Sequence, residues 1–299
     1  MKRLGGITYD GEIKTISAHP WNYRNRIQLH FEDGKSGFHT RGSRDLCEIE
    51  RCYISSPALV DAIHKLHDAA RASQWPKFLR SLELFTNEQQ LQLNVVDAGR
   101  PVAARFFEWC STFLDNVAYG AIEYSAAGYT FRISRGSFFQ VNRFLIDALV
   151  NEVLAESAGS HAVDLYAGVG LFSVPLAARF QHVDAVERGG PPYRDLTHNA
   201  SGVANLRSVR AAAEDFLCAL TEAPDLVVAD PPRAGVGRDA TRELLRIRPS
   251  RLTLVSCDPS TLSRDLKNLL SAYRMERLTL LDLFPQTYHF EVLVHLSRA

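Results

Sequence analysis

The sequence predicts an α/β protein in which a Rossmann-like domain of seven strands follows a smaller α+β domain. Two observations lead to this prediction. From His161 onward, short apolar runs alternate with helical stretches, which is typical of a doubly wound, mostly parallel sheet. Before Gly136, polar and apolar residues alternate between glycine turns, as in half-buried strands. We therefore expect an α+β domain at residues 1–135 and a Rossmann-like domain at residues 136–299.

The first domain shows strand and helix patterns in turn. Arg24 to Phe31 alternates as a half-buried strand does, and Gly34 and Gly37 mark a hairpin-like turn after it. Residues 57–73 open with a proline and repeat apolar residues at helical spacing, which predicts a helix. Further strands are expected at residues 82–85, 91–96 and 129–133.

The second domain shows seven apolar runs of strand length. Helices fit between the first six, whereas the last two leave no room for one, so the final strand is expected to be antiparallel. The expected strands are residues 162–166, 182–186, 206–211, 225–229, 252–255, 278–283 and 291–296.

Composition limits the function classes. The 34 basic and 34 acidic residues cancel, so any surface for nucleic acid must be local. No run is long enough to span a bilayer and no secretory signal is visible, so we expect no membrane partner. The five cysteines include no CxxC pair, which favours a reducing, cytoplasmic location and indicates no metal site.

A glycine turn follows the first strand of the second domain. Asp164 lies in this strand, and Tyr166 and Gly168 lead into a helix, where glycine lets the backbone approach a ligand closely. Ser173 stands where the third glycine of the dinucleotide fingerprint would be. Glu187 closes the next strand and is placed to accept hydrogen bonds from a ribose. These residues predict a nucleoside cofactor without separating NAD from S-adenosylmethionine.

Two later strand ends carry reactive groups. Asp230 is followed by two prolines and Arg233, a rigid turn that exposes the carboxylate. Cys257 ends the apolar run 252–255 and precedes a helix beginning near Ser260, whose amides would favour negative charge at that edge. A thiolate nucleophile suits this position. A buried structural cysteine is the alternative.

Six ordered segments of the chain together resemble the RNA uracil-5-methyltransferase family, which makes 5-methyluridine in tRNA and rRNA. The strand count also matches the seven-stranded methyltransferase form of the Rossmann architecture. The matching segments are residues 23–26 (YRNR), 137–142 (SFFQVN), 164–168 (DLYAG), 230–233 (DPPR), 256–266 (SCDPSTLSRDL) and 284–291 (FPQTYHFE).

The resemblance implies a role for each matched position. Cys257 would be the nucleophile and Glu291 the base that removes a proton, with His289 as the alternative base. A thiolate that adds to carbon 6 of uracil makes carbon 5 nucleophilic, and a base must then remove the proton on carbon 5. The S-adenosylmethionine site would be formed by Gln140, Tyr166, Gly168, Glu187 and Asp230.

The resemblance also implies an RNA partner, and the sequence departs from the family in several places. The RNA substrate is rRNA or tRNA, with rRNA slightly favoured, and no obligate protein partner is evident. We expect a compact member without the OB-like domain, and no iron–sulfur cluster, because Cys52 has no upstream cysteine trio. Ala167, Leu171 and Asp258 depart from common family residues and put the detailed cofactor contacts in question.

RNA would then be held by residues 1–135, as an RNA-recognition domain, and by the catalytic face. A basic stripe on the helix after the Asp230 turn is one candidate, with Arg233, Arg24 and Arg26 nearer the site. The alternative is a solvated helix face. The stripe consists of Arg238, Arg242 and Arg246.

Two other functions compete with this interpretation. A non-catalytic RNA-binding protein on a methyltransferase scaffold is disfavoured by the presence of Cys257, Glu291 and Asp230. A nicotinamide dehydrogenase is disfavoured by the incomplete glycine fingerprint. A cytosine-5 enzyme is also less favoured, because the turn after Asp230 has no Pro-Cys pair.

Overall fold

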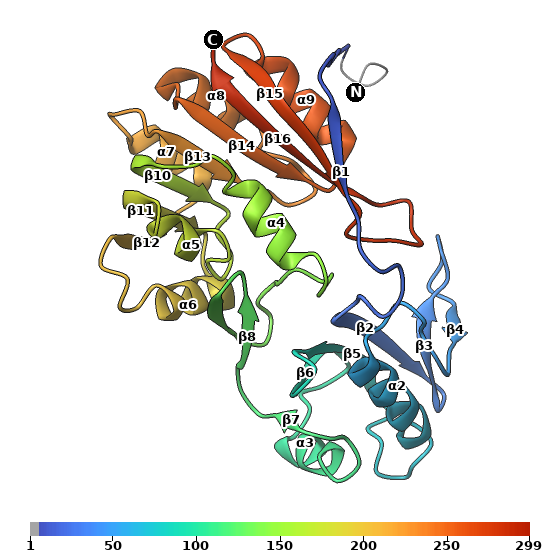
Figure 1. Cartoon of the computed structure of the whole chain (residues 1–299). Coiled ribbons are helices and arrows are strands. Elements are labelled where there is room, and N and C mark those ends of the chain that lie inside the picture. Colours follow the sequence, from blue (N-terminus) through green and yellow to red (C-terminus); the bar gives the residue numbers. More distant parts are fainter. Residues whose placement is uncertain (1–5) are drawn as a thin grey trace.

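The computed structural model describes residues 6–299 and shows two lobes, each built on its own sheet (Figure 1). The larger lobe holds an eight-stranded sheet in the order β1-β15-β16-β14-β13-β10-β11-β12. Its strands are β1 (Ile13–Ile16), β10 (Gly159–Leu165), β11 (Phe180–Glu187), β12 (Leu206–Arg210), β13 (Leu226–Ala229), β14 (Arg251–Ser256), β15 (Tyr273–Leu281) and β16 (Glu291–Arg298).

Helices cover both faces of this sheet, as a doubly wound fold requires. Buried residues of α4, α5 and α6 share one core with one face of the sheet, and those of α7, α8 and α9 share a second core with the other face. The helices are α4 (Ile146–Val153), α5 (Ser173–Ala177), α6 (Gly190–Asn199), α7 (Ala213–Ala219), α8 (Arg238–Ile247) and α9 (Pro259–Leu269). The predicted α/β class is confirmed, and β16 is antiparallel to both of its neighbours, as expected.

The smaller lobe is a six-stranded sheet in the order β4-β3-β2-β5-β6-β7. Helices α2 and α3 pack on it around a third core that includes Trp75 and Phe106. Its elements are β2 (Arg26–Glu32), β3 (Lys35–His39), β4 (Leu46–Glu48), α2 (Pro57–Ala69), β5 (Leu79–Thr86), β6 (Leu91–Ala98), α3 (Ala104–Cys110) and β7 (Val117–Ala118).

Two pieces of chain before residue 136 pack with the larger lobe. Strand β1 was not predicted, because its short sequence is mostly exposed, yet it pairs in parallel with β15 as an eighth strand. The hairpin of β8 (Ile122–Ala126) and β9 (Tyr129–Ile133) buries Phe131 in the core shared with α4. The boundary between residues 135 and 136 stays a prediction, and these three strands precede it in the sequence although they pack with the larger lobe.

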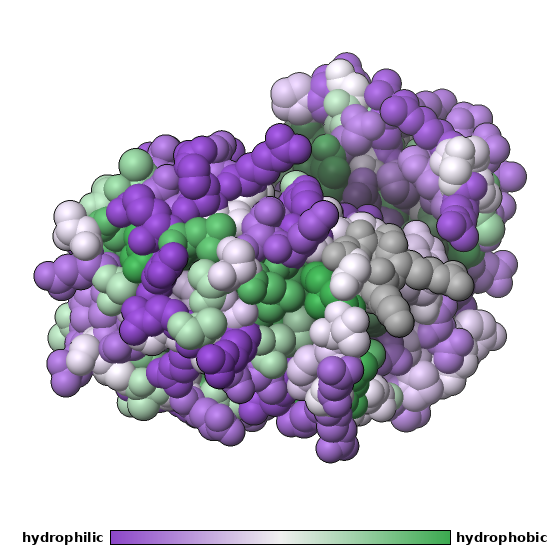
Figure 2. All heavy atoms as spheres, turned by 90° about the horizontal axis from the view of Figure 1, so that it is seen from above, coloured by the Kyte–Doolittle hydropathy of each residue, from purple (hydrophilic) through white to green (hydrophobic). Residues whose placement is uncertain are grey.

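One face of the molecule can be described from its colouring by hydropathy. Figure 2 shows hydrophilic residues over most of the face seen from above, with hydrophobic patches between them. In residues 6–299, no helix is both long enough and apolar enough to cross a membrane.

Candidate active site

The predicted site residues meet at the carboxyl edge of the large sheet. Strands β11, β10, β13 and β14 run parallel, and their register aligns Val186 with Leu165, Leu165 with Ala229 and Ala229 with Leu254. The residues that follow these positions therefore lie along one edge, where open α/β sheets bind ligands. Tyr166, Glu187 and Asp230 come directly after the aligned positions, and Cys257 comes three residues after Leu254.

The position of Glu291 follows from the antiparallel pairing of β14 and β16. The ladder pairs Ser256 with Val292. Cys257 and Glu291 are the next residues on these two strands, and the charge of Glu291 acts on the Cys257 thiol. Glu291 opens β16 and is buried, with 6% of its surface exposed, whereas Cys257 is half-buried. The thiol and the carboxyl are thus fixed at the same end of two paired strands.

Burial governs the electrostatics of this edge. Burial and the charge of Asp230 raise the pKa of Glu291 well above its usual range. Burial raises the pKa of Asp230 to about 7. Burial and the nearby charge of Glu291 also raise the pKa of the Cys257 thiol, and Arg233 opposes this effect. The site therefore holds acids that bind protons more tightly than usual, with one nearby cation that favours the thiolate.

The glycine turn provides the space that a nucleoside needs. The Gly168 amide donates to Glu187 Oε2 at 2.9 Å, which ties the turn to the end of β11. Gly168 has a φ of +57°, and a Cβ added there would meet no atom within 4 Å. Open space beside a fixed carboxylate suits the ribose and adenine of S-adenosylmethionine.

Asp164 supports this turn from inside the sheet. It is fully buried and accepts a hydrogen bond from the Ser173 hydroxyl at the start of α5. Burial raises the pKa of Asp164 to about 7. Its Oδ1 is buried without a hydrogen-bond partner among the described residues. The serine that interrupts the dinucleotide fingerprint thus binds the acid beneath the turn.

Tyr166 is at the predicted edge, but its hydroxyl is already occupied. It donates to the Val236 carbonyl at 3.0 Å. Burial raises the pKa of Tyr166 to about 12, so the hydroxyl stays protonated at neutral pH. The aromatic ring and the backbone of Tyr166 are therefore the groups that can contact a cofactor.

Gln140 reaches the same edge from the segment that follows β9. Its Nε2 donates to Asp230 Oδ2 at 3.3 Å. Asn25, fully buried, donates through Nδ2 to the Gln140 carbonyl at 3.1 Å. Sequence analysis gave Asn25 no role, although the residue lies in one of the matched segments.

Two residues of α6 were missed altogether. Asp195, fully buried, accepts from the Ser134 amide at 2.7 Å and from the Ser137 hydroxyl at 2.5 Å. Asn199 donates to the Val169 carbonyl in the glycine turn at 2.9 Å. Helix α6 therefore fixes the segment before Gln140 and the glycine turn to one another. Nothing in the local sequence pattern distinguished these residues from ordinary helix-surface polar groups.

The expected free helix amides beside Cys257 are not free. Asp258 caps α9, and its Oδ1 accepts from the Ser260 amide at 2.7 Å and the Thr261 amide at 3.2 Å. Asp258 thus supplies the negative charge that favours a helix N-terminus. This corrects the expectation that these amides would be directed at the thiol edge.

The arginine predictions need two corrections. Arg26 is buried, pairs with Glu83 at 3.2 Å and lies over the Phe85 ring, so it is not available to a phosphate. On α8, Arg246 pairs with Glu243 at 2.6 Å and also donates to three carbonyls at the end of α7. Arg242 pairs with Asp239 and with Glu243, so two of the three arginines of the stripe are neutralised.

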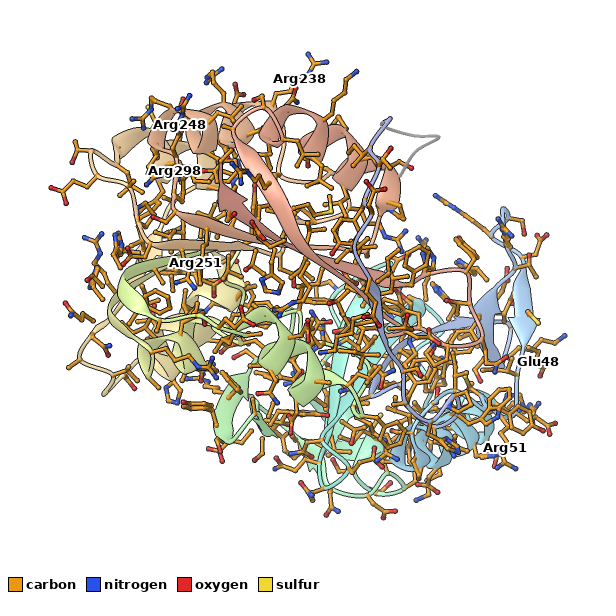
Figure 3. All side chains as sticks on the ribbon, turned by 45° about the horizontal axis from the view of Figure 1, so that its top comes forward. Glu48, Arg51, Arg238, Arg248, Arg251 and Arg298 are labelled. Atoms are coloured by element: carbon orange, nitrogen blue, oxygen red, sulfur yellow. The ribbon has the colours of Figure 1, made fainter. Side chains whose placement is uncertain are left out.

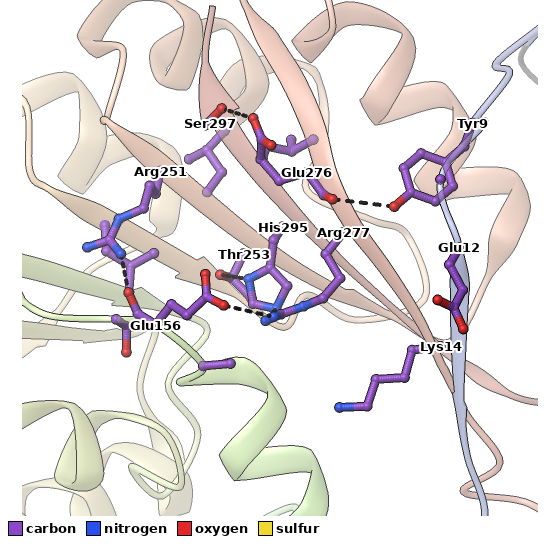
Figure 4. Close-up of a pocket in the computed structure, with 16 residues that line it drawn as sticks. Tyr9, Glu12, Lys14, Glu156, Arg251, Thr253, Glu276, Arg277, His295 and Ser297 are labelled. Atoms are coloured by element: carbon purple, nitrogen blue, oxygen red, sulfur yellow. Dashed lines mark hydrogen bonds and ion pairs between the residues drawn. The ribbon is translucent and has the colours of Figure 1, made fainter.

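A polar cavity of about 750 Å³ lies elsewhere (Figure 4). Arg251, the first residue of β14, and Ser297, near the end of β16, line it. It therefore lies toward the opposite end of the sheet from Cys257. Figure 4 shows that Arg277 points toward Glu156, and Arg251 donates to the Glu156 carbonyl at 2.5 Å. None of the predicted site residues line this cavity.

A second polar cluster is formed by His161, His182 and Asp184, whose possible ligand atoms lie within 4.8 Å of one another. Both carboxylate oxygens of Asp184 are engaged by the imidazoles, at 3.0 Å and 3.1 Å. Arg207 also donates to Asp184 at 2.6 Å. A guanidinium on this carboxylate favours a structural network over a cation site.

The sheet order, the glycine turn and the acids at the carboxyl edge define a Rossmann-like methyltransferase class. A family model described as tRNA (uracil-5-)-methyltransferase matches residues 59–299. The chain belongs to this family, whose members are RNA methyltransferases that use S-adenosylmethionine.

Several relatives agree with this membership. An uncharacterized RNA methyltransferase of Streptomyces avermitilis is 30% identical over all of this chain and 75% of its own length. The 23S rRNA (uracil(1939)-C(5))-methyltransferase RlmD of Cronobacter sakazakii is 31% identical, over 95% of this chain and 73% of its own length. The crystal structure of the Pyrococcus abyssi tRNA (uracil-54, C5)-methyltransferase with S-adenosyl-L-homocysteine has a TM-score of 0.82 and 24% identity. That structure covers 99% of this chain and 80% of its own, and it shows the shared fold.

Proposed function

We propose that this protein methylates carbon 5 of a uridine in structured RNA, with Cys257 as nucleophile and Glu291 as base. The observation that supports the proposal is the pairing of Ser256 with Val292 across β14 and β16, because Cys257 and the buried Glu291 are the next residues on these two strands. A uracil ring between them would offer carbon 6 to the sulfur and the proton of carbon 5 to the carboxylate.

Cys257 and Glu291 would each carry out one step of the reaction. Cys257 Sγ, as the thiolate, forms a bond to carbon 6, and the ring electrons move to carbon 5 and the carbonyl at position 4. S-adenosylmethionine, when bound, supplies the methyl group to carbon 5. Glu291, in its ionised form, then takes the proton from carbon 5, and the electron pair released expels the Cys257 thiolate from carbon 6.

Five residues would hold the cofactor. The Glu187 carboxylate suits the ribose hydroxyls, Gly168 leaves room for the backbone approach, and the Tyr166 ring offers an apolar face. Gln140 and Asp230, joined at 3.3 Å, would lie between the cofactor and the base. The raised pKa of Asp230 fits this position, since a nearby cationic sulfonium would favour its charged form.

The target base must leave its stack to reach the thiol, so flipping follows from this chemistry. We further propose that residues 1–135 contribute to RNA recognition and that residues 136–299 carry the transfer chemistry. Ribosomal RNA is slightly favoured over transfer RNA, and the similarity to RlmD of Cronobacter sakazakii supports this choice.

The deciding experiment incubates the protein and the methyl donor with rRNA or tRNA that contains 5-fluorouridine. Fluorine cannot be removed as a proton, so the enzyme is expected to remain covalently bound to its RNA. The adduct should form with wild-type protein and with Cys218→Ala, an exposed cysteine far from the edge, and should be absent in Cys257→Ala. If Cys257→Ala still formed the adduct, another nucleophile would carry the reaction.

A further inference from the structure

Four large aromatic side chains are exposed on segments that meet beside the active site. Trp21 and Tyr53 are 42% and 63% exposed, with ring centroids 6.3 Å apart. Phe144 and Tyr288 are 41% and 70% exposed. Arginines lie over three of these rings, with guanidinium carbons 4.6 to 5.1 Å from the centroids. We call the following residues the aromatic rim: Trp21, Tyr53, Phe144 and Tyr288, with Arg51, Arg143 and Arg41 over the last three rings in that order.

Hydrogen bonds fix the segments of the rim to one another. Tyr23 is fully buried, and its hydroxyl donates to the Pro285 carbonyl at 3.1 Å. The carbonyl of Tyr23 accepts from the Arg143 amide, and the Asn22 amide donates to the Tyr53 carbonyl, both at 3.0 Å. The rim is therefore built on segments that hydrogen bonds join directly, although its residues are far apart in the sequence.

The rim borders the proposed catalytic pair. The Tyr288 ring packs on His289 with centroids 4.1 Å apart, and Glu291 follows two residues later. Burial lowers the pKa of His289, and the charges of Arg233 and Arg24 lower it further, so both arginines lie near this loop. The rim therefore lies next to the segment that carries the proposed base.

The rim also differs from α8 in its charge. Arg41 and Arg51 have no carboxylate within 4 Å among residues 6–299, whereas Arg242 and Arg246 on α8 are paired. Figure 3 shows Arg51 and Arg238 on opposite sides of the molecule. Unpaired guanidinium groups over exposed rings offer both phosphate attraction and stacking surfaces.

We propose that the aromatic rim is a stacking platform for the single-stranded nucleotides that flank the target base. The proposal rests on the proposed function, because it assigns the substrate RNA to this surface. Every base has a face that can stack on an exposed ring, and a paired duplex does not offer that face. The protein would thus hold unpaired RNA beside the pocket that receives the flipped uridine.

The test measures binding of a labelled, unpaired RNA of about ten nucleotides, alone and annealed to its complement. Wild-type protein should bind the single strand more tightly than the duplex. Trp21→Ala combined with Tyr53→Ala should weaken single-strand binding roughly ten-fold or more. Tyr119→Ala is the matched control, because Tyr119 is 60% exposed but lies outside the rim. Thermal melting confirms that each variant is folded.

A second variant tests the charges without removing a ring. Arg41→Gln combined with Arg51→Gln should reduce the salt dependence of single-strand binding by about 1.4 in the logarithmic slope. Arg242→Gln combined with Arg246→Gln should leave it unchanged. Equal binding by wild type and both rim variants, or equal binding of single strand and duplex, would overturn the platform. If either of these negative binding results were found while the fluorouridine adduct still formed, the platform would be wrong and the proposed function would still hold. If the rim variants lost single-strand binding but wild-type protein formed no fluorouridine adduct, the platform would hold and the proposed function would be wrong.

Discussion

The two ends of the large sheet treat buried carboxyl groups in opposite ways. Hydrogen bonds from His161 and Arg207, near the amino-terminal ends of β10 and β12, overcome the effect of burial and lower the pKa of Asp184 to about 2. At the carboxyl edge, Asp230 and Glu291 have no cationic partner within 4 Å among the described residues, and burial raises the pKa of both. Unpaired, protonatable groups of this kind are typical of functional sites, and paired ones of structural sites.

The register of the strands explains why the Asp184 carboxylate has several hydrogen-bond donors. His161 lies opposite His182 across β10 and β11, and Asp184 lies opposite Arg207 across β11 and β12. Asp230 and Glu291, by contrast, lie at the end of β13 and the start of β16, away from these cationic donors. The comparison predicts that variants at the carboxyl edge change catalysis and variants at Asp184 change stability.

Glu291→Gln should have the largest effect. The variant can still form the bond from Cys257 to carbon 6, but it has no base for the proton of carbon 5. Turnover should fall roughly a thousand-fold or more, and a covalent complex should accumulate with ordinary uridine RNA. Denaturing gels and methyl-transfer assays measure the two effects.

His289→Gln is the control, because His289 is the alternative base. It should retain turnover within an order of magnitude and accumulate no complex. If His289→Gln trapped the complex while Glu291→Gln turned over, the roles of the two residues would be exchanged.

Asp184→Ala should have the next largest effect, on stability alone. It removes the carboxylate from two imidazoles and leaves Arg207 without a partner, so the free energy of unfolding should fall by about 3 kcal/mol. Because the native pKa is lowered, this stabilisation is present above about pH 4 and is lost as the pH falls toward 2. Urea unfolding at several pH values measures it.

Turnover well below the melting temperature should stay within about two-fold of wild type. A loss of turnover in folded Asp184→Ala would place this cluster in the catalytic machinery and break the comparison. Arg207→Ala should cost less than Asp184→Ala, since the Arg207 side chain is more than half exposed and can be solvated.

Sequence analysis located the residues of the carboxyl edge because the ends of apolar strands are local properties of the sequence. The end of an apolar run places Cys257, Asp230 and Glu187 correctly from the chain alone. Contacts between distant segments were not predicted in the same way. The hydrogen bonds of Asp195 to the segment before Gln140 join residues about 60 positions apart, and no periodic pattern encodes them.

Strand β1 and Arg26 show two other limits. Strand β1 forms by pairing at the edge of a sheet completed near the end of the chain, so its own four residues carry little signal. Arg26 has the residue type of a phosphate contact, but tertiary packing against Phe85 and Glu83 buries it. Residue type alone therefore did not predict whether the Arg26 side chain is accessible.

Asp230→Asn should raise stability at alkaline pH and lower activity. The native pKa of Asp230 is raised to about 7, so its contribution to stability is fully present below about pH 4 and is lost as the pH rises through 7. The asparagine side chain does not ionise, so the variant does not lose stability as the pH rises. The variant should therefore be more stable than wild type by roughly 2 kcal/mol at pH 8, with a smaller difference at pH 5.

Melting temperatures at the two pH values, without cofactor, measure this effect. Asp239→Asn, on the exposed side of α8, is the control and should show no such pH-dependent gain. An Asp230→Asn variant that was less stable than wild type at pH 8 would mean that the carboxylate has a favourable partner at this edge.

Arg233→Gln should have the smallest effect, confined to the pH profile. Burial and Glu291 raise the pKa of the Cys257 thiol, and Arg233 lowers it, so removing the guanidinium should raise it further. The rising limb of kcat/KM should then move to higher pH, with a loss of roughly two- to five-fold near neutrality that vanishes at alkaline pH. Arg233→Lys keeps the charge and should keep the wild-type profile. A uniform loss at every pH in Arg233→Gln would instead assign Arg233 to RNA binding, and the carboxyl edge would then have no cation that tunes its thiol.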